Sequence, residues 1–279
     1  MPQTLIQNYY TGHVLAEWRR LVKDAYHRIE FDTTLHFLEQ YLPPVLPQNS
    51  APHGLVLDAG GGPGRYTVEL ARRGYDLVLL DFTPANLDFA RRQVARLGLK
   101  RHLQGFIQGS IVDLAQFPAA AFDAVICTGG PLSHVLDSAD RERAIGELAR
   151  VAKPGAPIFV STMSRLGFLV EVLKVSQVEL ELPHFRQLLE TGDYFGGYGF
   201  TACHFFLPEE LRAAFTHPEL DILEMAGLEG VGSGHEKEIN QIAKNPARWQ
   251  SWLAAHYATC THPAVVGSCE HMLIVCRKN

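Results

Sequence analysis

The stretch VLDAGGGPGRY, residues 56–66, places an acidic residue, Asp58, just before a cluster of four glycines. Glycine loses more conformational entropy on folding than any other residue, so such a cluster indicates that backbone must come close to something. Asp81 ends the apolar run YDLVLLD roughly 20 residues later, the distance at which an acid commonly accepts hydrogen bonds from a bound ribose. The glycines and Asp81 together predict a nucleotide-type ligand at the ends of two neighbouring strands.

The spacing of the glycines separates two classes of cofactor. A dinucleotide site favours the pattern GxGxxG, whereas this chain has Gly60-x-Gly62-x-Gly64 and places Arg65 where the last glycine of that pattern would stand. The carboxylate of Asp58 would oppose a pyrophosphate and suit a cofactor that carries positive groups. A dinucleotide-dependent oxidoreductase stays open as an alternative.

The elements that must position these residues alternate between strands and helices over residues 54–163. This alternation predicts an α/β fold with a doubly wound, mostly parallel, Rossmann-like sheet of seven strands, whose C-terminal strand is antiparallel. Helical spacing between residues 13 and 42 predicts two N-terminal helices. We expect residues 1–50 to cover the cofactor site, residues 51–163 and 208–279 to form the sheet domain, and residues 164–207 to be an inserted substrate cap.

The ordered series of motifs resembles the class I S-adenosylmethionine-dependent methyltransferases, in particular those that act on small molecules. VLDAGGGPGRY looks like the first motif of that family, LVLLDFTPANLDFAR its second and GSIVDL its third. FDAVICTGGPLSHV and ELARVAKPGAPIFV resemble the next two. The resemblance implies S-adenosyl-L-methionine as cofactor, S-adenosyl-L-homocysteine as product, and methyl transfer by in-line displacement.

The resemblance also assigns roles to individual residues. Asp58 and the loop after it would line the methionine part of the cofactor, Asp81 would accept hydrogen bonds from both ribose hydroxyls, and the residue after Asp81 would lie near the adenine. Ser110 stands where the family often has Asp. The full set of expected cofactor residues is Asp58, Ala59, Gly60, Gly62, Gly64, Asp81, Phe82, Ser110, Ile111, Thr128 and Gly129.

The acceptor side depends on residues near the ends of the fourth and fifth strands and in the insertion. His134 follows the fourth strand, and a neutral imidazole there can take a proton from an oxygen or nitrogen nucleophile; alternatively, it only packs in its loop. We also expect Tyr10, Arg165, Tyr194, Tyr198 and His204 to contact the substrate. The aromatic residues among them could instead form the core of the insertion.

Composition narrows the remaining function classes. The formal net charge of −5 excludes a basic field over the whole protein, so we expect no nucleic-acid partner. No run approaches about 18 apolar residues, so no membrane span is predicted. Five scattered cysteines without a CxxC pair favour a cytoplasmic protein, and the His and Cys residues of 256–271 lack the paired spacing of a metal site.

Three functions are compatible with these sequence features. The first is an enzyme, a monomer or homodimer that methylates a small molecule at an oxygen, nitrogen, carbon or sulfur atom. The second is a module that binds S-adenosylmethionine without catalysis, and the third is an NAD-dependent oxidoreductase. Cofactor binding separates the third from the first two, and turnover separates the first from the second.

Overall fold

The computed structural model describes residues 2–45, 54–175, 177–196 and 200–279. Its main sheet has seven strands in the order β3-β2-β1-β4-β5-β9-β8. All neighbouring pairs from β3 to β5 are parallel, and β9 is antiparallel to both β5 and β8. This arrangement confirms the predicted fold class. The strands are β1 Leu55–Ala59, β2 Asp76–Asp81, β3 Leu103–Gln108, β4 Ala124–Cys127, β5 Pro157–Met163, β8 Leu220–Gly227 and β9 His271–Lys278.

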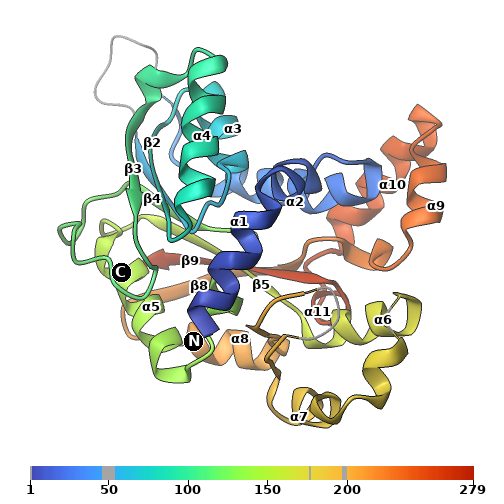
Figure 1. The fold of residues 1–279 in the computed structure, drawn as a ribbon. Coiled ribbons are helices and arrows are strands. Elements are labelled where there is room, and N and C mark those ends of the chain that lie inside the picture. Colours follow the sequence, from blue (N-terminus) through green and yellow to red (C-terminus); the bar gives the residue numbers. More distant parts are fainter. Residues whose placement is uncertain (1, 46–53, 176, 197–199) are drawn as a thin grey trace.

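Helices cover both faces of the sheet and follow the strands in the chain (Figure 1). Outside the insertion the longest are α1 Pro2–Arg20, α2 Ala25–Tyr41, α3 Arg65–Arg72, α4 Pro84–Arg96, α5 Ser138–Val151 and α10 Pro246–Thr259. The insertion contributes α6 Arg165–Val175, α7 Pro183–Thr191 and a small second sheet of β6 Asp193–Tyr194 and β7 Cys203–His204. Shorter helices are α8 Pro208–Ala214, α9 Glu236–Ile242, α11 Pro263–Val266 and the 3-10 turns η1 Lys100–His102, η2 Pro131–His134, η3 Gln177–Glu181 and η4 Gly230–Gly232.

The alternation of side chains along each strand creates two separate cores. Val56 of β1 packs in the core shared with α2 and α3, whereas Leu57 packs in the core shared with α5 and α8. Successive residues of a strand point to opposite faces, so every second side chain belongs to the same core. Asp58 therefore shares a face with Val56 and points toward α3.

The strand order reverses between β1 and β4, and this reversal creates a place for a ligand. The connections from two such neighbouring strands run to opposite sides of the sheet and leave a crevice beyond the carboxyl ends of the strands. Open α/β sheets bind ligands in this crevice. Here a cavity of about 440 Å³ is lined by residues that follow β1, β2, β3 and β4. Helix α1 crosses the front of the molecule and contributes side chains to the same cavity (Figure 1).

Within the part of the chain that the structure describes, no helix is both long and apolar enough to cross a membrane. All five cysteines are free and buried.

Candidate active site

The glycine loop after β1 forms one wall of the cavity through its backbone. Gly60, Gly62 and Gly64 all have positive φ angles, of 76°, 57° and 82°, which L side chains rarely adopt. The amide of Gly60 donates to the carbonyl of Leu80, 2.7 Å away, which ties the loop to the end of β2. A Cβ on Gly62 would have its nearest neighbour, Asn86 Nδ2, at 3.9 Å, so this glycine leaves open space. The loop is therefore a cradle whose inner surface is free for a ligand.

Asp81, the last residue of β2, presents a carboxylate to the cavity and organises the loops around it. Its Oδ2 accepts from the amide of Gly62 at 2.9 Å, and its Oδ1 accepts from the amide of Thr83 at 2.8 Å and from Asn86 at 3.2 Å. Burial raises the pKa of Asp81, and these hydrogen bonds oppose the rise. A carboxylate offers about four lone-pair positions, so Oδ2 keeps capacity for a ligand hydroxyl.

We expected Asp58 to line the methionine part of the cofactor, but the structure places its side chain outside the cavity lining. Its side chain is fully buried beneath the glycine loop, does not line the cavity, and accepts a 2.5 Å hydrogen bond from Thr67 of α3. Burial raises the pKa of Asp58 to about 7. A Cβ on Gly61 would overlap the Asp58 carboxylate, so Asp58 supports the loop from below. Ala59 and Gly64 also lie outside the cavity lining.

The expected adenine side of the cavity brings together residues from three parts of the chain. Phe82, Ser110 and Ile111 all line it. Ser110 Oγ already accepts from the amide of Val112 at 3.2 Å, so this hydroxyl also stabilises its own turn. Gln7 of α1 donates to the carbonyl of Phe82 at 3.1 Å, which ties α1 to the end of β2.

The other end of the cavity contains Thr128, Gly129, Tyr10 and His134. Tyr10 Oη lies 2.6 Å from His134 Nε2, and His134 Nδ1 lies 3.0 Å from the carbonyl of Ala202. A carbonyl only accepts, so Nδ1 carries the proton, and Nε2 is the acceptor of the Tyr10 hydroxyl. Burial lowers the pKa of His134 to about 4 and raises that of Tyr10 well above 10. Both groups are therefore neutral near pH 7.

Three of the residues expected to contact the substrate lie instead inside the insertion and its base. Arg165 donates to Glu210 at 3.0 Å, Tyr194 donates to Glu179 at 3.0 Å, and His204 bridges Glu210 and Asp193. None of the three lines the cavity. The sequence predicted a substrate contact for these residues because they follow β5 or are aromatic. In the structure, their polar atoms pair with carboxylates of the same chain. Tyr198 lies outside the described residues.

Several residues that line the cavity were not among the site residues predicted from the sequence. Glu17 and Arg20 come from the last turns of α1, and Asn86 comes from the first turn of α4. The place of Asn86 in the cavity could have been predicted, because this residue follows the Thr83-Pro84 start of a helix at the end of β2. The places of Glu17 and Arg20 could not, because they depend on how α1 packs over the sheet.

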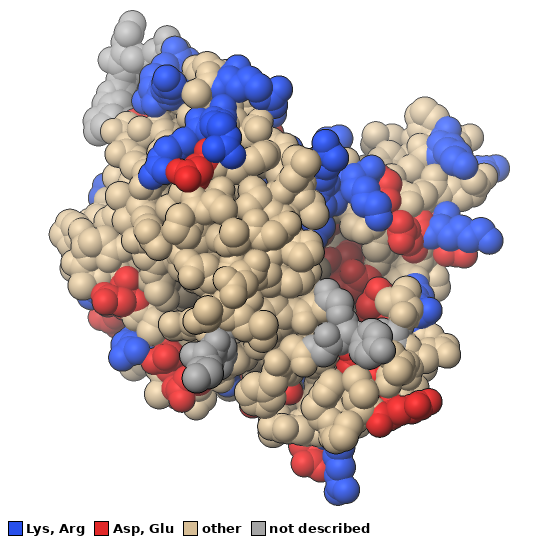
Figure 2. Space-filling view, viewed as in Figure 1, with Lys and Arg blue, Asp and Glu red and all other residues tan. Residues whose placement is uncertain are grey.

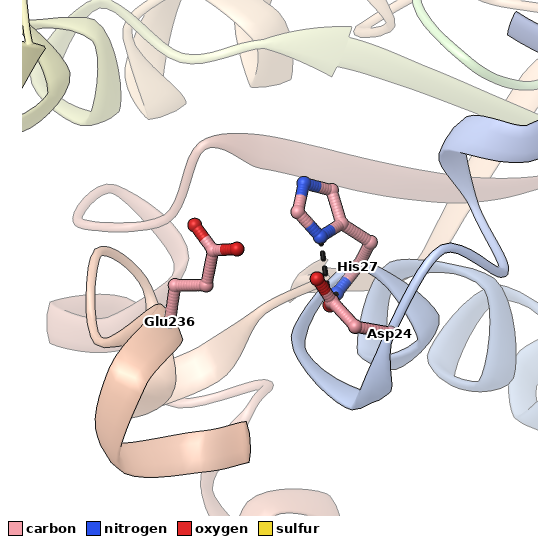
Figure 3. Close-up of side chains that lie close together, drawn as sticks. All are labelled: Asp24, His27 and Glu236. Atoms are coloured by element: carbon pink, nitrogen blue, oxygen red, sulfur yellow. Dashed lines mark hydrogen bonds and ion pairs between the residues drawn. The ribbon is translucent and has the colours of Figure 1, made fainter. Parts of the chain in front are cut away.

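Two groups of His and carboxylate side chains lie close together outside the motifs. Asp24, His27 and Glu236 meet at the starts of α2 and α9 (Figure 3). Asp24 already caps α2 by accepting from the amide and Nδ1 of His27 at 3.0 and 2.8 Å. The positive end of a helix dipole opposes a bound cation at such a place. We therefore assign Asp24 to helix capping.

The second group consists of the buried Glu30 and Glu229 and the half-buried His271, and it connects to the cavity through Arg20. Arg20 forms a bidentate ion pair with Glu30. His271 Nδ1 lies 2.7 Å from a carboxylate oxygen of Glu229 and 3.7 Å from one of Glu30. Burial alone would lower the pKa of His271, but the two carboxylates raise it to about 9. Positive and negative groups thus alternate, and each carboxylate has a cationic partner.

The cavity has the features that a nucleoside with a charged tail requires. Gly62 and Gly129 are open where a Cβ would point, with no neighbour closer than 3.9 and 4.0 Å. The buried atoms Thr128 Oγ1 and Asn86 Oδ1 have no hydrogen-bond partner among the described residues. A buried polar atom without a partner costs roughly 1–3 kcal/mol, so a ligand that supplies partners is favoured. These residues fit S-adenosylmethionine.

Comparisons with known proteins agree with this site. Residues 56–155 match the family described as a methyltransferase domain. A ubiquinone biosynthesis O-methyltransferase from Hahella chejuensis is 34% identical over 175 residues, which cover 62% of this chain and 65% of that protein. The match thus spans just under two thirds of the length of that relative.

Two solved structures share the fold at low sequence identity. A methyltransferase dependent on S-adenosylmethionine from Methanosarcina mazei is 17% identical, with a TM-score of 0.57, and the match covers 87% of this chain and 96% of that one. A geranyl diphosphate methyltransferase, solved in complex with S-adenosylmethionine, is 18% identical, with a TM-score of 0.57 and coverage of 97% and 90%. The family match, the relatives and the sheet order agree with the resemblance of the motifs to the class I S-adenosylmethionine-dependent methyltransferases: residues 56–155 form a methyltransferase domain.

Proposed function

We propose that this protein transfers the methyl group of S-adenosylmethionine to a hydroxyl group of a small, partly apolar molecule. The observation that carries the proposal is one continuous cavity, with Asp81 and the open glycine loop at one end and the Tyr10–His134 pair at the other. The likeness to O-methyltransferases supports oxygen as the accepting atom.

The chain supplies binding, orientation and proton transfer. When bound, the cofactor supplies a methyl group on a positively charged sulfur. Asp81 would hold the ribose, and the backbone of Gly60 and Gly62 would lie against the tail. Holding the acceptor in line with the methyl group can supply about 7–11 kcal/mol of the barrier. The apolar walls Ile6, Pro131, Val135 and Leu136 would exclude water from this place.

His134 would serve as the proton acceptor. Its Nδ1–H is fixed by the carbonyl of Ala202, so its Nε2 lone pair faces Tyr10. An entering hydroxyl group would donate to Nε2 and accept from Tyr10 Oη. As the oxygen–carbon bond forms, the proton moves to Nε2, and the electrons of the broken sulfur–carbon bond remain on sulfur. A base in this position typically contributes about 10²- to 10⁴-fold.

We further propose that the protein works in the cytoplasm, as a monomer or homodimer, without a nucleic-acid partner. Five free, buried thiols are consistent with a reducing compartment. On the face shown in Figure 2, Lys and Arg gather near the end of the molecule that carries α4, with Asp and Glu among them, while a broad central area carries no charged side chains. The uncharged central area does not favour a polyanion.

The test of the proposed function is turnover. The purified protein is incubated with S-adenosylmethionine and matched acceptors that carry a phenolic hydroxyl, an aromatic amine or a thiol on the same ring. Release of S-adenosylhomocysteine with a methyl ether as product supports the proposal. Tight cofactor binding with no turnover on any acceptor supports a non-catalytic binding module instead, and methylation of the amine or thiol alone contradicts the choice of oxygen.

A further inference from the structure

A pair of opposite charges on α1 lies at the wall of the cavity, beside Gly129. Glu17 and Arg20 both line the cavity, and Arg20 Nε lies 3.4 Å from Glu17 Oε2. The carboxylate of Asp58 does not reach the cavity, so it leaves the charged tail of the cofactor without the contact predicted from the sequence. The pair on α1 is placed to supply it.

The guanidinium of Arg20 keeps donors for a ligand. It has five N–H groups in a fixed plane, and its contacts among the described residues are two with Glu30 and one with Glu17. Its Nη2 is the nearest atom, at 4.0 Å, to the position that a Cβ on Gly129 would take. Gly129 follows β4, so Arg20 reaches from α1 to the loop after that strand.

A second feature beside Arg20 independently indicates a polar ligand at this place. Thr128 precedes Gly129, lines the cavity and is only 4% exposed. Its Oγ1 has no hydrogen-bond partner among the residues that the structure describes. A buried hydroxyl without a partner is costly, so a ligand group that donates to it or accepts from it is favoured.

Arg20 is held in this position by groups outside the cavity. Glu30 of α2 accepts from both Nη atoms, and His271 at the start of β9 lies 3.7 Å from the same carboxylate. Glu229 in turn holds His271 at 2.7 Å. This chain of alternating charges fixes the guanidinium before a ligand arrives, which reduces the entropy lost on binding.

We propose that Glu17 and Arg20 recognise the amino-acid end of the cofactor, with Arg20 on its carboxylate and Glu17 on its ammonium group, and that Glu30 and His271 are positioning residues for Arg20. An α-amino acid carries these two opposite charges on adjacent atoms, and the pair on α1 presents the complementary charges side by side. The inference rests on the proposed function, because it assumes the same cofactor. An acceptor that is itself an amino acid would present the same chemistry.

The test compares two ligands that differ only at that end. S-adenosylhomocysteine contains the amino-acid end, whereas 5′-methylthioadenosine has the same adenosine and sulfur without it. Calorimetric titration of Arg20→Met is expected to show at least a tenfold loss of affinity for S-adenosylhomocysteine, since charge-assisted hydrogen bonds are lost, and less than a twofold change for methylthioadenosine. Glu17→Gln should show a smaller loss with the same selectivity.

Two further variants separate recognition from folding. Arg19→Met, at the exposed neighbouring residue of α1, should change neither affinity. Arg20→Met/Glu30→Gln removes both charges of the buried pair, so it avoids leaving Glu30 without its partner, and it should show the same selective loss as Arg20→Met. Thermal melting confirms that each variant is folded.

The outcomes are distinct. An equal loss for both ligands would overturn the inference, because Arg20 would then shape the cavity as a whole. Unchanged S-adenosylhomocysteine affinity would also overturn it, and a raised KM for the acceptor in that case would assign Arg20 to the acceptor instead. If the wild-type protein binds S-adenosylhomocysteine and turns over, either result leaves the proposed function standing. Absence of binding by the wild-type protein would contradict both.

Discussion

Asp81 has a structural role in addition to the ribose contact that we propose for it. Its carboxylate accepts from Gly62, Thr83 and Asn86, so it fixes the glycine loop and the start of α4 together. Asp81 also lines the cavity. A ligand hydroxyl would thus be added to an arrangement that already exists, with little further ordering.

Replacing Asp81 with Asn keeps the shape of the side chain and removes its charge. Hydrogen bonds to a charged acceptor contribute about 1.5–3 kcal/mol, so S-adenosylhomocysteine affinity should fall roughly 10- to 100-fold. Isothermal titration calorimetry measures this change. Asp88→Asn, at an exposed position of α4, is the matched control and should bind normally; equal affinities of the two variants would remove Asp81 from the ribose site.

We propose that His134 takes part in the chemistry and not in cofactor binding. In His134→Gln, S-adenosylhomocysteine affinity should stay within about twofold, while kcat should fall by about 10²-fold or more if the imidazole accepts the proton. His217→Gln, at an exposed position, controls for the substitution. Because burial lowers the pKa of His134 to about 4, its protonation should not reduce kcat above pH 5. An acidic limb centred near 6.5 would contradict this environment.

The roles of residues follow from the elements that carry them. Alternation along β1 explains why Asp58 is beneath α3 and not in the cavity: it shares a face with Val56, which packs in the core of that side. The sequence showed both the strand and its neighbours. It did not show that the backbone of the next residues, and not this carboxylate, would form the cavity wall.

The loop between β1 and α3 offers a test at the level of an element. A valine at Gly62 would put a branched side chain into the open cradle and would also be strained at a φ of 57°. Gly98→Val has comparable strain at a φ of 72°, with no atom within 4 Å of its Cβ, and lies after α4. Both variants should melt at lower temperature than the wild type, but only Gly62→Val should lose S-adenosylhomocysteine binding by more than tenfold. Loss in both would indicate a general effect of strain.

The N-terminal helices show where sequence patterns are insufficient. Apolar spacing indicated helices only from residue 13, whereas α1 begins at Pro2. Residues 2–12 lack a clear apolar stripe because their side chains serve mixed purposes: Ile6 is buried, Gln7 donates to a backbone carbonyl, and Tyr10 binds His134. Such contacts depend on tertiary packing, which local periodicity does not encode.

At the scale of the whole molecule, the sheet was predictable because strands such as β1, β2 and β4 are short apolar runs beside glycine or acidic residues. The alternation with helices then limited the topology to a doubly wound sheet. The insertion was not predictable in detail. Its residues Arg165, Tyr194 and His204 are of types that suit a ligand, and only their pairing with Glu179, Asp193 and Glu210 shows that they stabilise the fold.

The buried charges that connect α1, α2 and β9 predict a dependence of stability on pH. The pKa of His271 in the folded protein is about 9, above its usual value near 6.5, because Glu30 and Glu229 outweigh the effect of burial. Protonated His271 therefore stabilises the folded state fully below pH 6.5, and this contribution is lost as the pH rises through 9. The shift corresponds to a contribution on the order of 3 kcal/mol.

Urea unfolding between pH 6.5 and 10 measures this contribution. The wild type should lose up to about 3 kcal/mol of unfolding free energy over that range. His271→Gln should be less stable at pH 6.5 and should lose less stability with rising pH. A parallel decline in the two proteins would assign the alkaline loss to other groups.

The most direct test of the central claim is a parallel calorimetric titration of the purified protein with S-adenosylmethionine, S-adenosylhomocysteine and NAD. Binding of the first two at micromolar concentrations, with no heat from NAD, is the result that the glycine loop, Asp81 and the family predict. Binding of NAD alone would contradict the account, because the cavity beside Gly62 would then hold a dinucleotide and the chemistry would be hydride transfer.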